Sequence, residues 1–361
     1  MIQKISISDF ISLRGSMPVF DVRSPGEFQH AHIPGAYSLP LFTDEERAVV
    51  GTLYKQQGKQ KAVKAGLDYF GTRMRAMVEE VEKAVKAFQK SNPAYAAGED
   101  ALPVIVHCWR GGMRSAGVAW LLDVYGFRVH TLVGGYKAYR KWALSRFEDP
   151  YDFRILGGYT GSAKTDILEA MRQEDVNIIN LEGLAHHKGS AFGAMGQEPQ
   201  PSQEMFENKL ALALFGAKGK ACWLEDESQR IGKLTIPHAL WRSMRQSPVF
   251  FLDKPFEERL DYIVKTYGGF YQEKYVQAVL RIQKRLGPME TKTTIGLLLE
   301  NNIHEAFRIL LVYYDKTYRK SLHNRENLDQ LLHTIPCTNT NSHSIIQQLL
   351  TCASQVSLAS S

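Results

Sequence analysis

The stretch HCWRGGMRS, residues 107–115, decides the fold of the first half of the chain. The apolar run VIV at 104–106 comes just before it and predicts a buried strand, and SAGVAWLL at 115–122 predicts a helix. A cysteine between a strand and a helix lies close to the unpaired N–H groups at the start of that helix. These groups and the helix dipole stabilise a thiolate, which is the nucleophilic form of cysteine.

The loop after this cysteine has the composition of an anion-binding loop. Gly111 and Gly112 allow the main chain to curl so that successive N–H groups point inward, and two arginines add positive charge at the rim. We predict that Cys108 is catalytic and that the loop holds a tetrahedral or persulfide-like anion against its sulfur. The alternative is an inert cysteine buried at a strand end. The predicted anion loop consists of Trp109, Arg110, Gly111, Gly112, Met113 and Arg114.

Strands and helices alternate around this loop. Apolar runs at 19–22 and 128–133 predict strands in addition to the one at 103–107, and the charged stretch from about 43 to 98 predicts helices. This alternation predicts an α/β layer. Because the pattern breaks and restarts near 146, we expect one domain at 1–146, with 43–98 as a helical insertion, and a second at 147–361.

The second domain begins with a glycine-rich loop, GYTGSAKT at 158–165, between the apolar run FRILGG at 153–158 and a helical pattern. This order is typical of a P-loop, in which N–H groups surround phosphate oxygens, a lysine adds charge and a hydroxyl can hold Mg²⁺. Ala163 replaces the second glycine of the motif, which carries a penalty if the position needs a positive φ. A turn that only caps the helix is the alternative. The predicted phosphate-binding residues are Gly158, Thr160, Gly161, Ser162, Lys164 and Thr165.

Later apolar runs extend the second domain. NIINL at 177–181, ACWLED at 221–226 and VFFLD at 249–253 predict buried strands, so we expect a P-loop NTPase-like α/β domain. From about 255 the pattern is mainly helical, and the last 20 or so residues, rich in Ser and Thr, predict a loose tail.

Other candidate site residues lie between these runs. Asp226 and Glu227 follow a predicted strand and could hold Mg²⁺, although acids are also common at ordinary solvated strand ends. His186, His187 and Arg230 are candidate substrate contacts, with packing or surface roles as the alternative for the histidines. Beyond this Mg²⁺ we predict no cofactor.

The stretch DVRSPGEFQHAHIPGAYSLP at 21–40, followed by the cysteine loop, resembles the rhodanese family over roughly residues 5–140. In rhodanese-like domains the loop cysteine carries sulfur or selenium. A common sulfurtransferase loop has four residues between the cysteine and the closing Arg or Thr, whereas five separate Cys108 from Arg114. The loop therefore also fits the HCx5R pattern of cysteine phosphatases, and a larger ring of amides suits a phosphate-sized anion.

Several longer stretches resemble the tRNA 2-selenouridine synthase family. They are LEGLAHHKGSAFG at 181–193, PSQEMFEN at 201–208, EDESQRIGKL at 225–234 and ERAVVGTLYKQQG at 46–58, together with CWRGGMRS itself. The similarity extends to about residue 330. It implies an enzyme that acts on the wobble uridine of tRNAs carrying 2-thiouridine. The sulfur is first alkylated with a geranyl group from geranyl diphosphate, and selenophosphate then supplies selenium in a half-reaction that needs Cys108. We expect the P-loop to bind the donor diphosphate or a tRNA phosphate.

Composition is compatible with this interpretation. The chain has 361 residues, 44% of them hydrophobic and 23% charged, which is typical of a globular protein. No run of about 18 apolar residues is present, and the N-terminus lacks the apolar region of a signal peptide. The four cysteines form no CxxC pair and fit a reducing compartment, so we expect a cytoplasmic protein without a membrane partner. The net charge of +6 permits an RNA partner.

Three other readings remain open from the sequence. The chain could be a rhodanese-fold cysteine phosphatase, or a simple sulfurtransferase, fused to a nucleotide-binding domain. It could also be a non-catalytic tRNA-binding scaffold that retains a rhodanese fold. The phosphatase reading requires a general acid near the loop and gives no reason for the motifs between 181 and 234.

Overall fold

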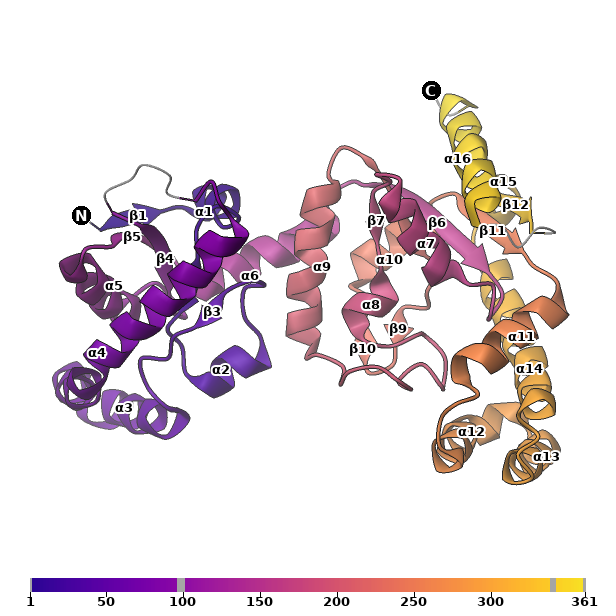
Figure 1. The fold of residues 1–361 in the computed structure, drawn as a ribbon, viewed down its shortest axis with the longest axis horizontal. Helices are drawn as coiled ribbons and strands as arrows, with labels where there is room; N and C mark the ends of the chain where they lie inside the picture. Colours follow the sequence, from indigo (N-terminus) through magenta and orange to yellow (C-terminus); the bar gives the residue numbers. More distant parts are fainter. Residues whose placement is uncertain (1, 96–100, 338–341, 360–361) are drawn as a thin grey trace. The chain divides into compact units, whose positions relative to one another are not determined.

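The computed structural model describes residues 2–95, 101–337 and 342–359, with only the backbone for 357–359. The chain forms two compact units, Met1–Ser145 and Arg146–Ser361, which are described separately (Figure 1). Residues 96–98 of the predicted helical insertion lie outside the described residues, as do 360–361 of the predicted tail.

The N-terminal unit is built on a parallel sheet with the strand order β1-β5-β4-β2-β3. Its central strand is β4, so the segment after β4 emerges at the carboxyl edge of the sheet between two neighbouring strands. Helices α4 and α5 contact each other, and α1 contacts α6. The elements are β1 Gln3–Ile5, α1 Ile7–Leu13, β2 Val19–Asp21, α2 Pro25–His30, β3 Tyr37–Ser38, α3 Asp44–Gln57, α4 Lys59–Ser91, β4 Pro103–His107, α5 Met113–Tyr125, β5 Arg128–Leu132 and α6 Gly135–Ser145.

The core of this unit explains why the long charged helix α4 folds onto the sheet. Val81 and Val85 of α4 are fully buried in the same cluster as Val104 and Val106 of β4. A helix that carries apolar residues at intervals of three and four gains stability by burying that stripe, while its charged residues stay in solvent. The insertion predicted from the sequence is thus one side of the core that supports the cysteine loop.

The C-terminal unit has a second parallel sheet, with the order β12-β11-β6-β8-β7. Its central strand β6 leads directly into the glycine-rich loop. The elements of this sheet and its first helices are η1 Arg146–Glu148, β6 Asp152–Gly158, α7 Lys164–Gln173, β7 Ile178–Ile179, α8 Leu181–Ala185, α9 Gln203–Ala217, β8 Ala221–Glu225, β9 Arg230–Ile231, β10 Leu234–Thr235, α10 His238–Arg245 and β11 Val249–Asp253. The later elements are α11 Phe256–Tyr267, α12 Gln272–Leu286, α13 Pro288–Leu299, α14 Ile303–His323, α15 Leu328–Leu331, β12 Leu332–Pro336 and α16 Ser342–Ala359.

The predicted α/β architecture, with a rhodanese-like unit and a P-loop unit, is confirmed. The region after 255 is mainly helical, as predicted, and it also contains β12, which extends the sheet by pairing with β11. One expectation about the C-terminal end is wrong. The predicted loose tail is the helix α16, whose Ile345, Ile346 and Leu349 are buried in a cluster with residues of α7. These apolar side chains at positions i, i+1 and i+4 stabilise a helix despite the Ser- and Thr-rich composition.

Within the described ranges, none of the helices combines the length and apolar character that a membrane span requires.

Candidate functional site

Cys108 lies at the carboxyl end of the central strand β4, at the floor of the loop that leads into α5. The Gly112 N–H donates to its sulfur at 3.4 Å, and the Ser115 hydroxyl oxygen lies 3.3 Å from the same sulfur. Burial raises the pKa of the Cys108 thiol. Hydrogen bonds from the Ser115 hydroxyl and from the N–H groups of Ser115, Gly112 and Arg110 outweigh it, so the pKa lies below the ordinary value for cysteine. These hydrogen bonds therefore favour the thiolate form of Cys108.

Two glycines hold the loop in its curled form. Gly111 and Gly135 have φ values of +64° and +57°, a region that favours glycine. A Cβ on Gly111 would lie 2.5 Å from the Leu132 carbonyl oxygen, and a Cβ on Gly135 would overlap the Cys108 carbonyl. The Tyr136 N–H donates to that same Cys108 carbonyl at 2.9 Å. The start of α6 thus fixes the backbone beside the reactive sulfur.

A buried ion pair from the stretch 21–40 packs against aromatic residues of the loop and of α6. Arg23 and Asp21 are both buried and pair at 2.6 Å. The Arg23 guanidinium also stacks on the Tyr136 ring at 3.8 Å and approaches the Trp109 ring at 5.9 Å. His107 is fully buried with a ring nitrogen 3.8 Å from Asp21, and burial lowers its pKa, so it is neutral at pH 7. The ion pair and the ring contacts of Arg23 together position Trp109 of the loop.

The two predicted arginines have different surroundings. Arg114 pairs with Glu27 of α2 at 3.1 Å, so its guanidinium is oriented by a carboxylate from the 21–40 stretch. Burial raises the pKa of Glu27, but the charge and hydrogen bond of Arg114, the Ser24 N–H and the charge of Arg47 together outweigh it. The pKa of Glu27 therefore lies below its usual range, and Glu27 is ionised at pH 7. Arg110 is exposed at the rim, as are Trp109 and Met113. The six predicted loop residues therefore lie between Cys108, which is itself buried, and the first turn of α5.

The second loop, between β6 and α7, has the backbone of a P-loop. Gly158, Gly161 and Ala163 have φ values of +147°, +84° and +61°. The left-handed conformation costs a non-glycine residue about 1–2 kcal/mol, so Ala163 bears the penalty that its position implied. The Lys164 ammonium donates to the Gly158 carbonyl at 3.0 Å and thus lies folded over the loop. A phosphate oxygen can replace that carbonyl as acceptor.

Residues far along the chain brace this loop. The Gly158 N–H donates to the Tyr318 hydroxyl at 3.2 Å, and the buried Arg259 donates to the Thr160 carbonyl at 3.0 Å. Arg259 is itself held by two hydrogen bonds to Asp315, at 2.9 and 2.7 Å. Helix α14 therefore fixes the P-loop at several points. The Ser162 hydroxyl donates to a carbonyl within the loop, which makes it a structural member of the turn.

Carboxylates gather beside Lys164 and Thr165. The Thr165 hydroxyl donates to Glu182 at 2.8 Å. Burial and the nearby charge of Glu182 raise the pKa of Glu225 to about 8, and the same two causes raise the pKa of Glu227 well above its usual value. One oxygen of the buried Glu225 has no hydrogen-bond partner in the described residues. Crowded acids of this kind can be relieved by a cation.

Asp226 points elsewhere. Its carboxylate pairs with Arg325 at 2.6 Å and accepts a hydrogen bond from Tyr318 at 2.7 Å. It therefore braces α14 and the loop, while Glu227 is the acid next to Lys164. Among the described residues, no group of three or more His, Cys, Asp or Glu side chains is arranged as a complete metal site. Mg²⁺ commonly uses one or two carboxylates together with water and substrate phosphates, and such a site needs no full protein cage.

The other three predicted site residues, His186, His187 and Arg230, have different surroundings. His187 is buried and Glu182 is close enough to influence its charge, although burial is the larger effect and lowers the pKa of His187. His186 has a left-handed backbone at the end of α8 and contacts the Pro199 carbonyl at 3.1 Å. Arg230 is exposed and donates to the Gly232 carbonyl at 3.1 Å, within the β9–β10 turn. Of these residues His187 lies nearest to the acids beside the P-loop.

Sequence reasoning missed several residues of both sites. They are Ser115, Glu27, Glu182, Arg259, Asp315 and Tyr318. A signal was present for Ser115, because it directly follows Arg114 at the start of a helix, where a hydroxyl can reach back to the loop. No local pattern announces Arg259 or Tyr318, which reach the P-loop only through the fold.

A curled cysteine loop on one parallel sheet and a P-loop on another define a rhodanese-like domain followed by a P-loop-like α/β domain. The family model of the rhodanese-like domain matches residues 8–141. The family model of the tRNA 2-selenouridine synthase AAA domain matches residues 151–334. The chain is 36% identical over 296 residues to the tRNA 2-selenouridine synthase of Pseudomonas putida strain GB-1, covering 75% of each protein. It is 38% identical over 338 residues to that of Cupriavidus pinatubonensis, covering 83% of this chain and 87% of that one.

Among solved structures, the crystal structure of the N-terminal domain of a putative ATP/GTP binding protein from Clostridium difficile is 34% identical. It covers 39% of this chain and 99% of that one, with a TM-score of 0.34. The family model and the relatives establish the assignment: the chain belongs to the tRNA 2-selenouridine synthase family and is a tRNA-modifying transferase.

Proposed function

We propose that this protein converts wobble 2-thiouridine of tRNA into 2-selenouridine in two steps, using geranyl diphosphate in the first and selenophosphate in the second. The observation that carries the proposal is the Cys108 sulfur held by the Gly112 N–H and the Ser115 hydroxyl, with its pKa lowered. A separate P-loop in the same chain supports a second anionic substrate. Two anion loops correspond to two anionic donors.

In the first step the thiocarbonyl sulfur attacks C1 of the geranyl group. A C–S bond forms, the C–O bond to the diphosphate breaks, and the uridine loses its N3 proton to solvent. Charge develops on the leaving diphosphate, so Lys164 and the N–H groups at the start of α7 are suited to stabilise it. Thr165, Glu182 and Glu227 are the residues that would hold a Mg²⁺ ion, which would neutralise part of the diphosphate charge.

In the second step selenium replaces the alkylated sulfur. A new C–Se bond forms at C2, the C–S bond breaks, and the geranyl group leaves as a neutral thiol after taking up a proton. Water accepts the phosphoryl group, so inorganic phosphate is the other product. No net oxidation or reduction occurs. The first step is needed because an unalkylated sulfur would have to leave as sulfide, which is a poor leaving group.

Electron balance limits what Cys108 can do. A perselenide on Cys108, with phosphorus leaving as phosphate, would need a two-electron oxidant. Attack of the thiolate on phosphorus needs none: an S–P bond forms, the P–Se bond breaks, and hydroselenide is released to attack C2. Water then cleaves the S–P bond and restores the thiolate. The five residues between Cys108 and Arg114 suit a loop around a tetrahedral phosphoryl group, and Ser115 can donate to the sulfur when it leaves phosphorus.

The phosphatase interpretation is favoured by the same HCx5R spacing, but the carboxylate that pairs with the loop, Glu27, carries no proton. Glu27 is ionised at pH 7, with its pKa lowered further by Arg114, Ser24 and Arg47, so it has no proton to give to an alkoxide leaving group. Hydroselenide needs no such proton, because a selenol is far more acidic than an alcohol. Cys108-dependent hydrolysis of alkyl phosphates would favour the phosphatase instead.

The proposal is tested by incubating the protein with 2-thiolated tRNA and then digesting the tRNA to nucleosides for mass spectrometry. Geranyl diphosphate alone should give the S-geranylated nucleoside, and selenophosphate added afterwards should give 2-selenouridine. Selenophosphate without geranyl diphosphate should leave 2-thiouridine unchanged. Formation of 2-selenouridine without any geranyl donor would contradict the two-step route.

A further inference from the structure

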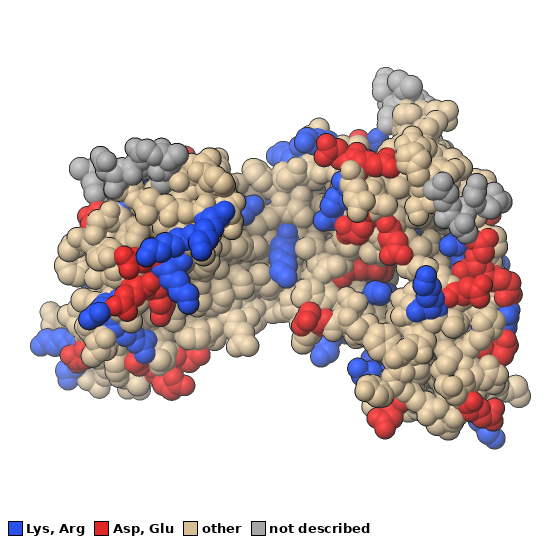
Figure 2. All heavy atoms as spheres, viewed as in Figure 1, with Lys and Arg blue, Asp and Glu red and all other residues tan. Residues whose placement is uncertain are grey.

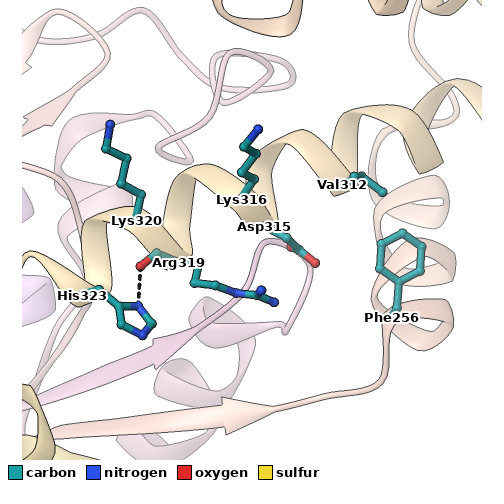
Figure 3. A pocket seen from close by; sticks show the side chains of 7 residues that line it. All are labelled: Phe256, Val312, Asp315, Lys316, Arg319, Lys320 and His323. Atoms are coloured by element: carbon teal, nitrogen blue, oxygen red, sulfur yellow. Dashed lines mark hydrogen bonds between the residues drawn. The ribbon is translucent and has the colours of Figure 1, made fainter.

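We propose that a cleft between α11 and α14 of the C-terminal unit binds a stretch of the tRNA phosphodiester backbone. This inference rests on the proposed function only in taking tRNA as the substrate. The cleft has a volume of about 590 Å³, and most of its lining comes from α14 (Figure 3). We call it the α14 cleft.

Four cationic or protonatable side chains lie along α14, and Figure 3 shows Arg319 and His323 on the other side of the helix axis from Lys316 and Lys320. Lys316, Arg319, Lys320 and His323 are spaced at i, i+3, i+4 and i+7, all four line the α14 cleft, and all are exposed. Residues at this spacing share a helix face. Figure 3 shows Lys316 and Lys320 extending in the same direction from the helix, with the His323 ring hydrogen-bonded to the Arg319 carbonyl. The face is suited to an anion that runs along the helix.

The positive charge of this face is not cancelled by the protein. Throughout residues 2–95, 101–337 and 342–359, no carboxylate forms an ion pair with Lys316 or Lys320. The one acid that lines the cleft, Asp315, is occupied by Arg259 through two hydrogen bonds. Arg259 thus compensates the charge of Asp315, and Lys316 and Lys320 remain available to an incoming anion.

The length of the face argues for a polyanion. Lys316 and His323 lie seven positions apart, which corresponds to about 10 Å along a helix. A nucleic-acid strand offers a repeating series of phosphates over such a length. Elsewhere, on the face drawn in Figure 2, lysine and arginine side chains alternate with acidic ones in the C-terminal unit.

The other end of the α14 cleft is apolar, which suits a nucleoside. Phe256 and the exposed Val312 line this end, and Figure 3 shows the Phe256 side chain beside Val312. Aromatic side chains next to a basic groove take bases or riboses by stacking, without reading their sequence. The cleft thus combines phosphate contacts with a sequence-tolerant apolar contact.

The α14 cleft is also connected to the P-loop. Arg319, which lines the cleft, donates from Nε to the hydroxyl of the P-loop residue Tyr159 at 3.3 Å. A tRNA strand bound along α14 would therefore pass beside the loop proposed to hold the alkyl donor. We expect the cleft to contribute to bringing substrate and donor together.

The test is the salt dependence of tRNA binding by the full chain, measured by fluorescence anisotropy with labelled, unmodified tRNA. Each phosphate neutralised by a lysine adds about 0.7–0.9 to the slope of log affinity against log salt. For the double variant Lys316→Ala/Lys320→Ala we expect the slope to fall by about 2, so that the loss of affinity between 50 and 200 mM salt is about tenfold smaller than for the unmodified protein. The Lys316→Arg/Lys320→Arg variant should restore binding.

A matched control is available on α4, where Lys86 and Lys90 are also exposed and four residues apart. Lys86→Ala/Lys90→Ala should bind tRNA as the unmodified protein does. An unchanged slope in the α14 variant overturns the inference, as does weaker binding with an unchanged slope, because that loss would not come from phosphate contacts. Nucleoside formation by the unmodified protein is measured separately, so a failure of the proposed function is distinguished from a failure of this site.

Discussion

The hydrogen bond between Ser115 and Cys108 gives a direct quantitative prediction. The Ser115 hydroxyl has one proton, which it donates to the Gly112 carbonyl at 3.1 Å, and its oxygen lies 3.3 Å from the Cys108 sulfur. When the thiolate forms, the hydroxyl can turn and donate to sulfur instead. A hydrogen bond to a charged group contributes about 1.5–3 kcal/mol. Since one pKa unit corresponds to about 1.4 kcal/mol, Ser115→Ala should raise the pKa of Cys108 by about 1–2 units.

The assay is the rate of iodoacetamide alkylation as a function of pH, with the modified cysteine identified by peptide mass spectrometry. Below both pKa values the rate for Ser115→Ala should be about 10–100 times lower than for the unmodified protein. Burial raises the pKa of Cys222 to about 12 and that of Cys337 to about 11, so these thiols should react far more slowly.

A matched serine control separates this effect from a general loss of stability. Ser12 lies on α1, outside the cysteine loop. Its hydroxyl donates to the Ser8 carbonyl at 3.2 Å. Ser12→Ala should leave the alkylation curve unchanged. If the Ser115→Ala curve coincides with that of the unmodified protein, the hydroxyl does not stabilise the thiolate and the reasoning is refuted.

Three further variants test the geometry of the two loops. Ala163→Gly removes the left-handed alanine and should raise the free energy of unfolding in urea by up to about 1 kcal/mol. The gain is limited because glycine has more conformational entropy in the unfolded chain. A lower free energy of unfolding would show that Ala163 is not strained. Gly135→Ala places a Cβ on the Cys108 carbonyl at a positive φ and should cost at least about 2 kcal/mol in the same titration, whereas an unchanged midpoint would contradict the packing. Burial raises the pKa of Glu225 to about 8, so the folded protein keeps a proton that the unfolded chain releases above its usual value of 4.5. Stability should therefore fall as the pH rises between these values, and Glu225→Gln should flatten that fall; equal pH profiles of the urea midpoint in both proteins would speak against it.

The sequence predicts the fold where strong local patterns and the sheet agree. Buried runs such as 104–106 and 249–253 are strands, and the break near 146 lies beside the division after Ser145. Short elements are less visible, because β1 and β12 contain only three and five residues and depend on pairing with β5 and β11. Composition misled the prediction for α16, since its buried Ile and Leu residues lie among Ser and Thr.

The candidate site shows the same division between local and distant information. The residues of each loop could be proposed from the sequence because glycines, a cysteine and a lysine occur at characteristic spacings. Their partners could not, because Glu27 reaches Arg114 across 87 residues and Arg259 reaches Thr160 across 99. Asp226 was expected beside a Mg²⁺ ion, a role that stays a prediction, and the structure places it against Arg325. Which of two neighbouring acids faces the loop depends on side-chain direction at a strand end, which the sequence does not determine.

The most direct test of the central claim is nucleoside mass spectrometry on tRNA treated with Cys108→Ser, geranyl diphosphate and selenophosphate. The account predicts that the S-geranylated nucleoside accumulates and that no 2-selenouridine forms, because the P-loop unit is intact and the thiolate is missing. Formation of 2-selenouridine by Cys108→Ser at the rate of the unmodified protein would contradict it.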